Sequence, residues 1–233
     1  MSETTRKIGF WSAILSAVFS VLWFITYSLR DVIASVPAWH NLQAYAEAFS
    51  PVRILYVFPS LLLALTFLAL MSCIYRWASE DKKTWGLIGL SVAIVYSAMA
   101  SINYNIQAVA VSNSLENGQT MGIAMLLPDN PNSVFKALAN SYVYMALAML
   151  ASGFVFGGSK IKNWIRGIFA AQIVTVVGQV GWSMFGLNTA VFTVTSLVWV
   201  VGAPVAFVLL AVLFKQHTSP RSAASLKEET SYA

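Results

Sequence analysis

Charge is scarce in this 233-residue chain: only 10% of the residues are Asp, Glu, Lys or Arg, whereas 58% are hydrophobic. An ordinary globular domain carries roughly 25% charged residues, so this chain has too few charges to cover a water-exposed surface. The composition excludes a soluble enzyme, a nucleic-acid-binding module and a disulfide scaffold. The formal net charge of +5 is better explained by topology signals in membrane loops than by a nucleic-acid partner.

Groups that carry chemistry are also few. The middle of each long apolar run lacks Asp, Glu, Lys, Arg and His, the residues that proton relays, ion-coupled carriers and voltage sensors place there. The single cysteine, Cys73, cannot form an intramolecular disulfide. His40 and His217 are predicted on opposite faces of the membrane, so they cannot share a metal. We therefore expect no cofactor and no metal site, and a non-catalytic protein is favoured over an enzyme.

Long apolar runs dominate what remains. A bilayer core of about 30 Å needs about 20 apolar residues in a helix, because lipid offers the backbone no hydrogen-bond partners. Six runs qualify, which predicts an all-α integral membrane bundle. The predicted spans are Ile8–Leu29, Val52–Trp77, Thr84–Ser112, Ser133–Phe156, Asn163–Phe185 and Thr189–Phe214.

Positive charges predict the orientation of these spans, because cytoplasmic loops are enriched in Lys and Arg. One set of span ends carries three basic residues, Arg30, Arg53 and Lys136. The other carries the remaining eleven: Arg6, Lys7, Arg76, Lys82, Lys83, Lys160, Lys162, Arg166, Lys215, Arg221 and Lys227. Both termini are therefore predicted in the cytoplasm. We expect one transmembrane domain over residues 1–215, uncleaved at its N-terminus, and a disordered cytoplasmic tail over 216–233, which is rich in Ser and charge.

Both long outer loops contain apolar residues. After Pro37, four apolar residues recur at helical spacing opposite polar ones, which predicts an amphipathic helix at the outer interface, either as a flat anchor or as a lid. These four are Trp39, Leu42, Ala46 and Phe49. In the second outer loop, residues 121–127 form an apolar patch too short to span a membrane, which we expect to fold back onto the bundle.

Uncharged polar residues collect in the outer halves of the predicted spans. On the fifth span Gln172, Thr175, Gln179 and Ser183 follow spacings of three and four, so they share one face. A carboxamide turned toward lipid leaves hydrogen-bonding groups unsatisfied, so we expect these side chains to face inward. They predict a cup open to the outer face and closed below by apolar packing. The eight residues predicted to bind a ligand there are Tyr27, Tyr56, Asn103, Gln107, Asn140, Gln172, Gln179 and Trp182.

Two residues need separate interpretation. Asn105 continues a ridge of small residues on the third span and lies opposite Asn103 and Gln107, which predicts a structural role and a third span surrounded by the others. Trp199 lies near mid-span, where it either forms the floor of the cup or faces lipid. The whole polar set remains open to a second interpretation, in which these side chains bond only to one another between helices.

Two short basic segments carry a resemblance. Arg6-Lys7-Ile8-Gly9 leads directly into the first span, and Lys162-Asn163-Trp164-Ile165-Arg166-Gly167 precedes the fifth. In these segments and in its arrangement of spans the chain resembles an uncharacterised family of bacterial six-span membrane proteins of unknown function. The resemblance implies six helices in a prokaryotic inner (plasma) membrane, and it implies no activity or site residues.

The leading functional hypothesis is an outward-facing, uncharged polar cavity that binds, or lets pass, a small neutral or amphipathic molecule. An accessory subunit of a larger membrane complex is the alternative, because small-residue ridges could dock a partner subunit or a second copy. A third hypothesis is an enzyme that acts on lipid at the outer interface and uses Asp31, His40 and Glu47. The expected partners are membrane lipid, the ligand and, under the alternative, other membrane subunits; no nucleic acid is expected.

Overall fold

In the computed structural model of the protein, the residues described are 2–34, 39–130 and 132–216. Within these ranges six helical segments are long and apolar enough to cross a membrane, which confirms the six predicted apolar helices and indicates a helical membrane protein. These segments are Glu3–Ile33, Pro51–Trp77, Glu80–Glu116, Val134–Gly153, Lys160–Phe185 and Thr189–Gln216. The predicted tail lies, apart from Gln216, outside the described residues.

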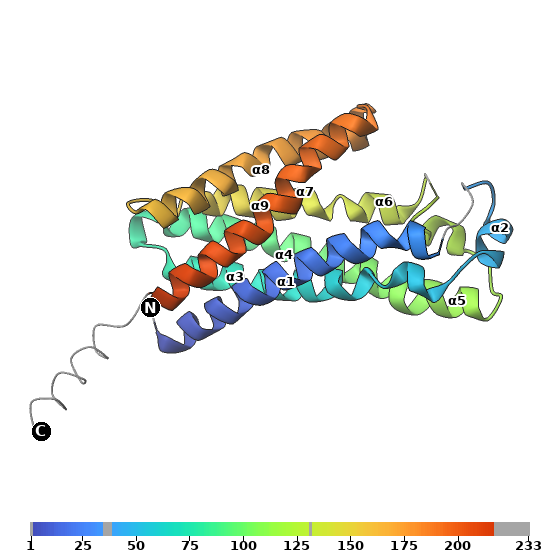
Figure 1. The fold of residues 1–233 in the computed structure, drawn as a ribbon, viewed down its shortest axis with the longest axis horizontal. Helices are drawn as coiled ribbons and strands as arrows, with labels where there is room; N and C mark the ends of the chain where they lie inside the picture. The colour runs from blue at the N-terminus through green and yellow to red at the C-terminus, as the bar shows by residue number, and fades with distance from the viewer. Residues whose placement is uncertain (1, 35–38, 131, 217–233) are drawn as a thin grey trace, which may run out of the picture.

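Four of the six segments are built mainly from one continuous helix, and two are composite (Figure 1). The continuous helices are α1 (Glu3–Ile33), α3 (Val57–Trp77, preceded by the 3-10 turn η1, Pro51–Ile54), α8 (Lys160–Phe185) and α9 (Thr189–Gln216). The third segment joins η2 (Glu80–Lys82), α4 (Lys83–Asn105), the π-helix η3 (Ile106–Val111) and α5 (Ser112–Glu116). The fourth breaks at Asn140, between α6 (Val134–Ala139) and α7 (Ser141–Gly153).

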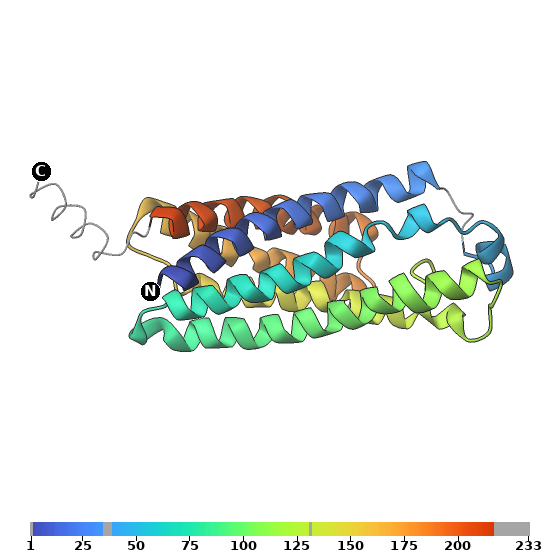
Figure 2. The ribbon, with the colours of Figure 1, turned by 90° about the horizontal axis from the view of Figure 1, so that it is seen from below.

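The six segments form a closed ring. Each long helix packs against two neighbours, in the order α1, α3, α4, α7, α8, α9 and back to α1. The described chain ends of α1 and α9 lie at the same end of the bundle, as Figure 1 and Figure 2 show. We call this the inner end of the bundle and the opposite one the outer end. That the inner end faces the cytoplasm remains a prediction.

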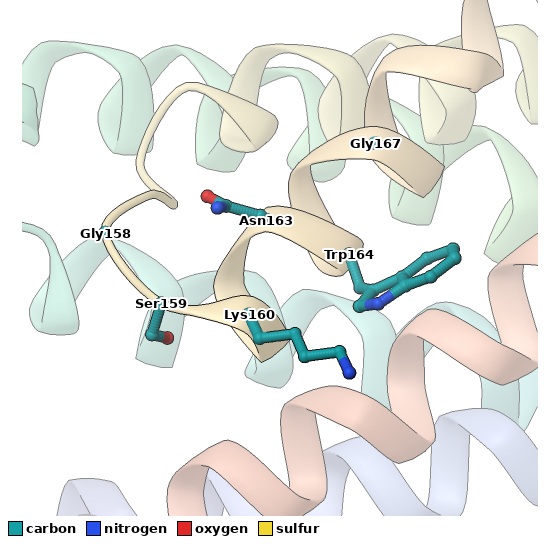
Figure 3. A pocket seen from close by; sticks show the side chains of 6 residues that line it. All are labelled: Gly158, Ser159, Lys160, Asn163, Trp164 and Gly167. Carbon is teal, nitrogen blue, oxygen red and sulfur yellow. The ribbon is translucent and has the colours of Figure 1, made fainter.

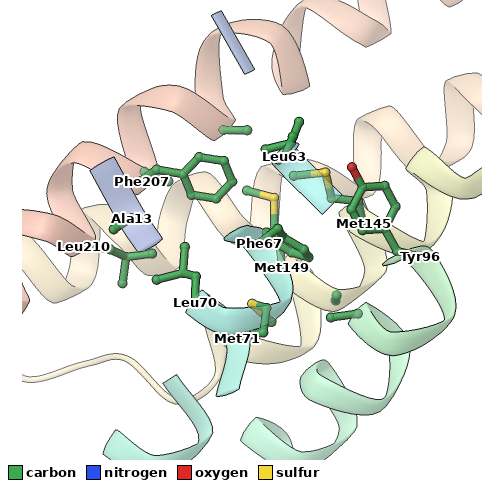
Figure 4. Packing of buried hydrophobic residues seen from close by; sticks show 14 of the residues in the cluster. Ala13, Leu63, Phe67, Leu70, Met71, Tyr96, Met145, Met149, Phe207 and Leu210 are labelled. Atoms are coloured by element: carbon green, nitrogen blue, oxygen red, sulfur yellow. The ribbon is translucent and has the colours of Figure 1, made fainter. Parts of the chain in front are cut away.

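Apolar side chains fill the ring from its middle toward its inner end. Phe67 of α3 packs edge-to-face on Tyr96 of α4, with ring centroids 5.6 Å apart, and lies 6.0 Å from the Phe207 ring of α9. Met145 and Met149 of α7 are fully buried beside them (Figure 4). These bulky side chains close the bundle toward its inner end, in agreement with the apolar sequence of the helices there.

The third span is not surrounded by the other helices, contrary to our expectation. Asn105 is exposed, and its Nδ2 donates to the carbonyl of Ser101, 2.8 Å away on the same helix. Because the amide is partly satisfied by its own backbone, α4 can present this residue at the surface of the bundle. Gly89 of the same ridge does allow a close approach, since a Cβ there would lie 3.0 Å from the Ala148 carbonyl of α7.

Substituting Gly89 by alanine should therefore reduce stability. The new Cβ would also clash with Ser152 Oγ, and overpacking of this kind costs about 1–3 kcal/mol. Gly167 of α8 is the matched control, because a Cβ there meets nothing within 4 Å. Gly167→Ala should raise stability by about 0.5–1 kcal/mol. Unfolding in mixed micelles measures both changes, and equal effects at the two positions would contradict the close α4–α7 contact.

The outer loops pack together over the outer end of the ring, where we define the outer cap as α2 (Leu42–Glu47), α5 and η4 (Ile123–Leu126). Tyr45 of α2 is buried together with Leu115, Ile123 and Leu127. This confirms that the apolar patch at residues 121–127 folds back onto the bundle, although Met121 itself is exposed. The short helix α2 falls within the predicted amphipathic segment, and its position at a membrane interface remains a prediction.

Candidate functional site

Seven aromatic rings meet in the outer half of the bundle, directly above the apolar core. They come from five segments, and we call them the aromatic cluster. Its members are Trp23 and Tyr27 of α1, Tyr56 before α3, Tyr96 and Tyr104 of α4, Tyr142 of α7 and Trp199 of α9. Of the six segments, only the one formed by α8 contributes no ring.

Ring contacts connect the aromatic cluster throughout. The Trp199 centroid lies 5.1 Å from Trp23 and 5.1 Å from Tyr142, both in edge-to-face geometry. Tyr142 lies 5.8 Å from Tyr96, and the Tyr104 and Tyr142 hydroxyls are hydrogen bonded at 3.0 Å. Tyr56, before α3, completes the set, since its ring centroid lies 6.2 Å from that of Tyr104.

The stacked pair of Trp23 and Tyr27, with centroids 5.3 Å apart, forms the α1 side of the cluster. These two residues are four apart, so one face of α1 presents both rings. The Tyr27 ring also lies 5.4 Å from that of Tyr56. Tyr27 is 39% exposed, whereas the α4, α7 and α9 members are buried. The cluster therefore reaches the surface of the bundle along α1.

Several buried polar atoms in and beside the cluster have no hydrogen-bond partner. Within it these atoms are Tyr56 Oη, Tyr96 Oη and Trp199 Nε1. Asn103 Nδ2 and Ser141 Oγ are also unpartnered, and they belong to the residues adjacent to Tyr104 and Tyr142 in the chain. Burying a polar group without a partner costs free energy, so a set of them needs an explanation. Trp199 Nε1 can only donate, so its missing partner is an acceptor.

Four charged residues connect the outer end of the ring to the loops. Arg53, which is only 3% exposed, places Nη2 3.0 Å from Asp31 Oδ1 and 3.2 Å from Asp129 Oδ2. Its Nη1 donates to the Ala34 carbonyl. Arg30 Nη2 lies 3.6 Å from Asp129 Oδ1. Since two cations face two anions, this charge cluster adds no net charge to the outer end.

The charge cluster touches both the aromatic cluster and the outer cap. The Arg30 guanidinium lies over the Tyr27 ring, 4.4 Å from its centroid, and 5.9 Å from that of Tyr56. On the cap side, burial and then the nearby Asp129 carboxylate raise the pKa of Tyr45. The Tyr45 hydroxyl therefore stays protonated at neutral pH, and it faces the charged groups as a neutral side chain.

The structure brings only part of the predicted binding set together. Tyr27 and Tyr56 belong to the aromatic cluster, and Asn103 is buried one residue before Tyr104. Gln107 lies in the π-helix, a feature frequent at functional sites, but its Nε2 donates to the Leu126 carbonyl at 2.6 Å. Gln107 thus holds the outer cap, while its Oε1 remains without a partner.

The other predicted residues lie elsewhere. Gln172 is fully buried, and its Oε1 accepts from Thr175 Oγ1, which also bonds to the Thr195 carbonyl of α9. Gln179 Nε2 lies 3.5 Å from the Ala139 carbonyl, so it contacts the break that Asn140 makes in the fourth segment. Trp182 stacks on Phe192 at 4.7 Å. Polar side chains of α8 therefore connect this helix to α9, through Thr175, and to the fourth segment, through Gln179.

Sequence reasoning missed much of the aromatic cluster. Trp23, Tyr96, Tyr104 and Tyr142 received no role, because a single aromatic residue in an apolar span has no distinctive pattern. Trp199 is 4% exposed, so it is not turned toward lipid. The charge cluster was missed too, although a signal existed: Arg30 and Asp31 are adjacent, and Arg53 is one of only three basic residues predicted outside.

Two hollows stand out on the described surface, and none of the eight predicted binding residues lines either one. The first, about 660 Å³, lies at the inner end of α8 beside Lys160, Asn163 and Trp164 (Figure 3). The second, about 530 Å³, is an apolar groove between α1 and α9.

Two of the three residues named in the enzyme hypothesis have partners elsewhere. Asp31 is paired with Arg53, and Glu47 Oε1 accepts from Gln43 at 3.1 Å. Over the described ranges 2–34, 39–130 and 132–216, no group of three or more His, Cys, Asp and Glu residues is placed to hold a metal ion.

Comparison of the chain with protein-family models, curated proteins and solved structures found no match. The resemblance to a bacterial six-span family therefore remains a prediction.

Proposed function

We propose that the protein binds a small, uncharged molecule at the aromatic cluster and acts without catalysis, as a sensor or a facilitator of passage. The observation that carries the proposal is a set of buried, unpartnered polar atoms within one cluster of rings: Tyr56 Oη, Tyr96 Oη and Trp199 Nε1. A bound molecule with oxygen acceptors would satisfy them, since Trp199 Nε1 requires an acceptor and a phenol can donate or accept.

The electrostatics favour a neutral ligand. None of the seven rings carries a formal charge, and the Arg30 guanidinium at the edge of the cluster is balanced by Asp129. An ion brought into such surroundings would lose its hydration without gaining a counter-charge, which is costly. An aromatic lining with a few hydrogen-bonding atoms is typical of sites for small amphipathic molecules.

The proposal includes a location. The protein lies in a prokaryotic inner membrane with both ends in the cytoplasm, so the aromatic cluster occupies the half of the bilayer away from the cytoplasm. The excess of basic residues at the predicted cytoplasmic ends supports this orientation.

Trp199→Phe is the first test, because it removes one hydrogen-bond donor and keeps an aromatic ring. Native mass spectrometry of protein extracted from its membrane should show a bound small molecule on the wild type. Occupancy should fall at least tenfold in the variant. Trp164→Phe is the control, since Trp164 is exposed at the inner end, and it should leave occupancy unchanged.

The stability of the ligand-free protein distinguishes ligand binding by Trp199 from a purely structural role of its side chain. Removing the buried, unsatisfied donor offsets part of the cost of the smaller ring, so Trp199→Phe should lower the stability of the ligand-free protein by no more than about 1 kcal/mol. A wild type that carries no small molecule would contradict the proposal. So would a Trp199→Phe variant that retains the bound molecule at full occupancy.

A further inference from the structure

The groove between α1 and α9 is the second hollow in the described surface. Val18, Val21 and Leu22 form its α1 wall, and Pro204, Val205 and Val208 form its α9 wall, with only apolar residues in the lining. Val21, Val205 and Val208 are exposed at the surface of the bundle. The groove therefore faces the hydrocarbon region and can hold only an apolar occupant.

The outer end of this groove meets the aromatic cluster. On α1 the lining residue Leu22 is followed directly by Trp23, and on α9 Trp199 precedes Pro204 by five residues. The rings of Trp23 and Trp199 touch, with centroids 5.1 Å apart. Because α1 and α9 run in opposite directions, both tryptophans lie on the outer side of the groove.

Above this level the two helices separate. Ser20 is the last buried residue of α1, and no residue of α9 before Trp199 is buried. Figure 1 shows α1 and α9 close together at the inner end and diverging toward the outer end. The aromatic cluster is thus approached from the side of the bundle, along the surface that lipid covers.

Trp199 and Val200, about one helical turn before Pro204 in α9, each carry a hydrogen-bonding group that bears on the occupant of the groove. Trp199 Nε1 is a buried donor without a partner. Pro204, inside α9, has no N–H, so it cannot donate to the Val200 carbonyl as an ordinary residue would. The turn of α9 before Pro204 therefore contains one unpartnered donor, Trp199 Nε1, and a carbonyl that receives no bond from Pro204.

We propose that the α1–α9 groove holds the apolar chain of a membrane lipid whose uncharged, oxygen-bearing head group hydrogen bonds to Trp199 Nε1. This inference rests on the proposed function and specifies its ligand class. The ligand comes from the membrane, because packed residues such as Leu127 and Arg53 cover the outer end. A second copy of the chain suits the groove less well, since helices dock closely through small residues and these walls are mainly valine and leucine.

Photolabelling in nanodiscs tests the inference. The nanodiscs contain phosphatidylcholine and a diacylglycerol with a diazirine in its acyl chain, which is uncharged and has ester carbonyls and a hydroxyl. A phosphatidylcholine with the same diazirine reports ordinary lipid contact. The diacylglycerol should label residues 17–22 and 204–209 at least fivefold more than the phosphatidylcholine probe.

Groove-filling variants give the matched comparison. Val208→Trp, or Val21→Trp on the opposite wall, should lower diacylglycerol labelling of the groove to the phosphatidylcholine level. Val212→Trp, at another exposed position of α9 outside the groove, should leave it unchanged. Using both walls keeps the test valid if one variant fails to fold.

The outcomes separate the inference from the proposed function. In one outcome Trp199→Phe abolishes the labelling, but the labelled residues lie outside the groove or the labelling survives Val208→Trp and Val21→Trp. The acyl chain then does not lie in the groove, so the inference is overturned and the proposed function stands. Labelling that none of these variants changes, or that never exceeds the phosphatidylcholine level, overturns the inference, while the native mass spectrometry of wild type and Trp199→Phe decides the proposed function separately. Cross-links between two copies through the groove would show that its occupant is protein, and would overturn the inference alone.

Discussion

Arg53→Met is expected to lower the free energy of unfolding by about 3 kcal/mol, because removing one partner of a buried ion pair leaves the other charge uncompensated. Arg53 is almost fully buried and contacts Asp31, at the outer end of α1, and Asp129, in the second outer loop. Its loss should also loosen the outer cap, since Nη2 holds Asp129, which follows η4 in the second outer loop. Unfolding in mixed micelles measures the stability, and proteolysis between residues 113 and 130 reports the cap.

The control for Arg53 is an ion pair in water. Lys83 and Glu80 are paired at the exposed inner end, so Lys83→Met should change stability by at most about 0.5 kcal/mol. Combining Arg53→Met with Asp129→Leu should cost less than the sum of the two single changes, because neither charge is then left alone. Additive losses would show that the two side chains do not interact.

Phe67→Ala is expected to cost about 3–5 kcal/mol, since it leaves a cavity that the surrounding helices cannot fill. Phe67 is fully buried between Tyr96 and Phe207 and supports the aromatic cluster from below. The change should also reduce ligand occupancy, because Tyr96 loses the ring against which it packs. Unfolding and native mass spectrometry measure the two effects.

Phe58→Ala on the same helix gives the comparison. Phe58 is 54% exposed, so removing its ring leaves no internal cavity and should cost less than about 1 kcal/mol. Phe67→Leu keeps most of the volume and should lie between the two alanine variants. Similar losses at positions 58 and 67 would mean that α3 does not turn Phe67 into the core.

Much of the helical arrangement could be predicted because it depends on local composition. Each run of about twenty apolar residues must form a helix in lipid, whatever the rest of the chain does. The composite segments were harder to predict. The break at Asn140 and the π-helix at 106–111 depend on contacts such as the bond from Gln107 to the Leu126 carbonyl, which join residues distant in sequence.

The candidate site was less accessible from the sequence. Hydrogen-bonding capacity led us to the amides Gln107, Gln172 and Gln179, but these side chains mostly bond to nearby carbonyls and hydroxyls. Among the described residues, three of the eight buried, unpartnered side-chain atoms belong to aromatic residues, whose burial depends on the ring order of the helices. Tyr96 and Tyr142 lie 46 positions apart in the chain, yet their rings are 5.8 Å apart.

The order of amino acids alone specifies six apolar helices and an asymmetric distribution of basic residues at their ends, because both follow from how each segment exchanges water for lipid. Folding in three dimensions decides which helices are neighbours, where α1 and α9 separate, and which polar atoms are left without partners. The physical reason is that side-chain packing and hydrogen bonding between helices are short-range interactions, so they exist only once distant segments have been brought into contact.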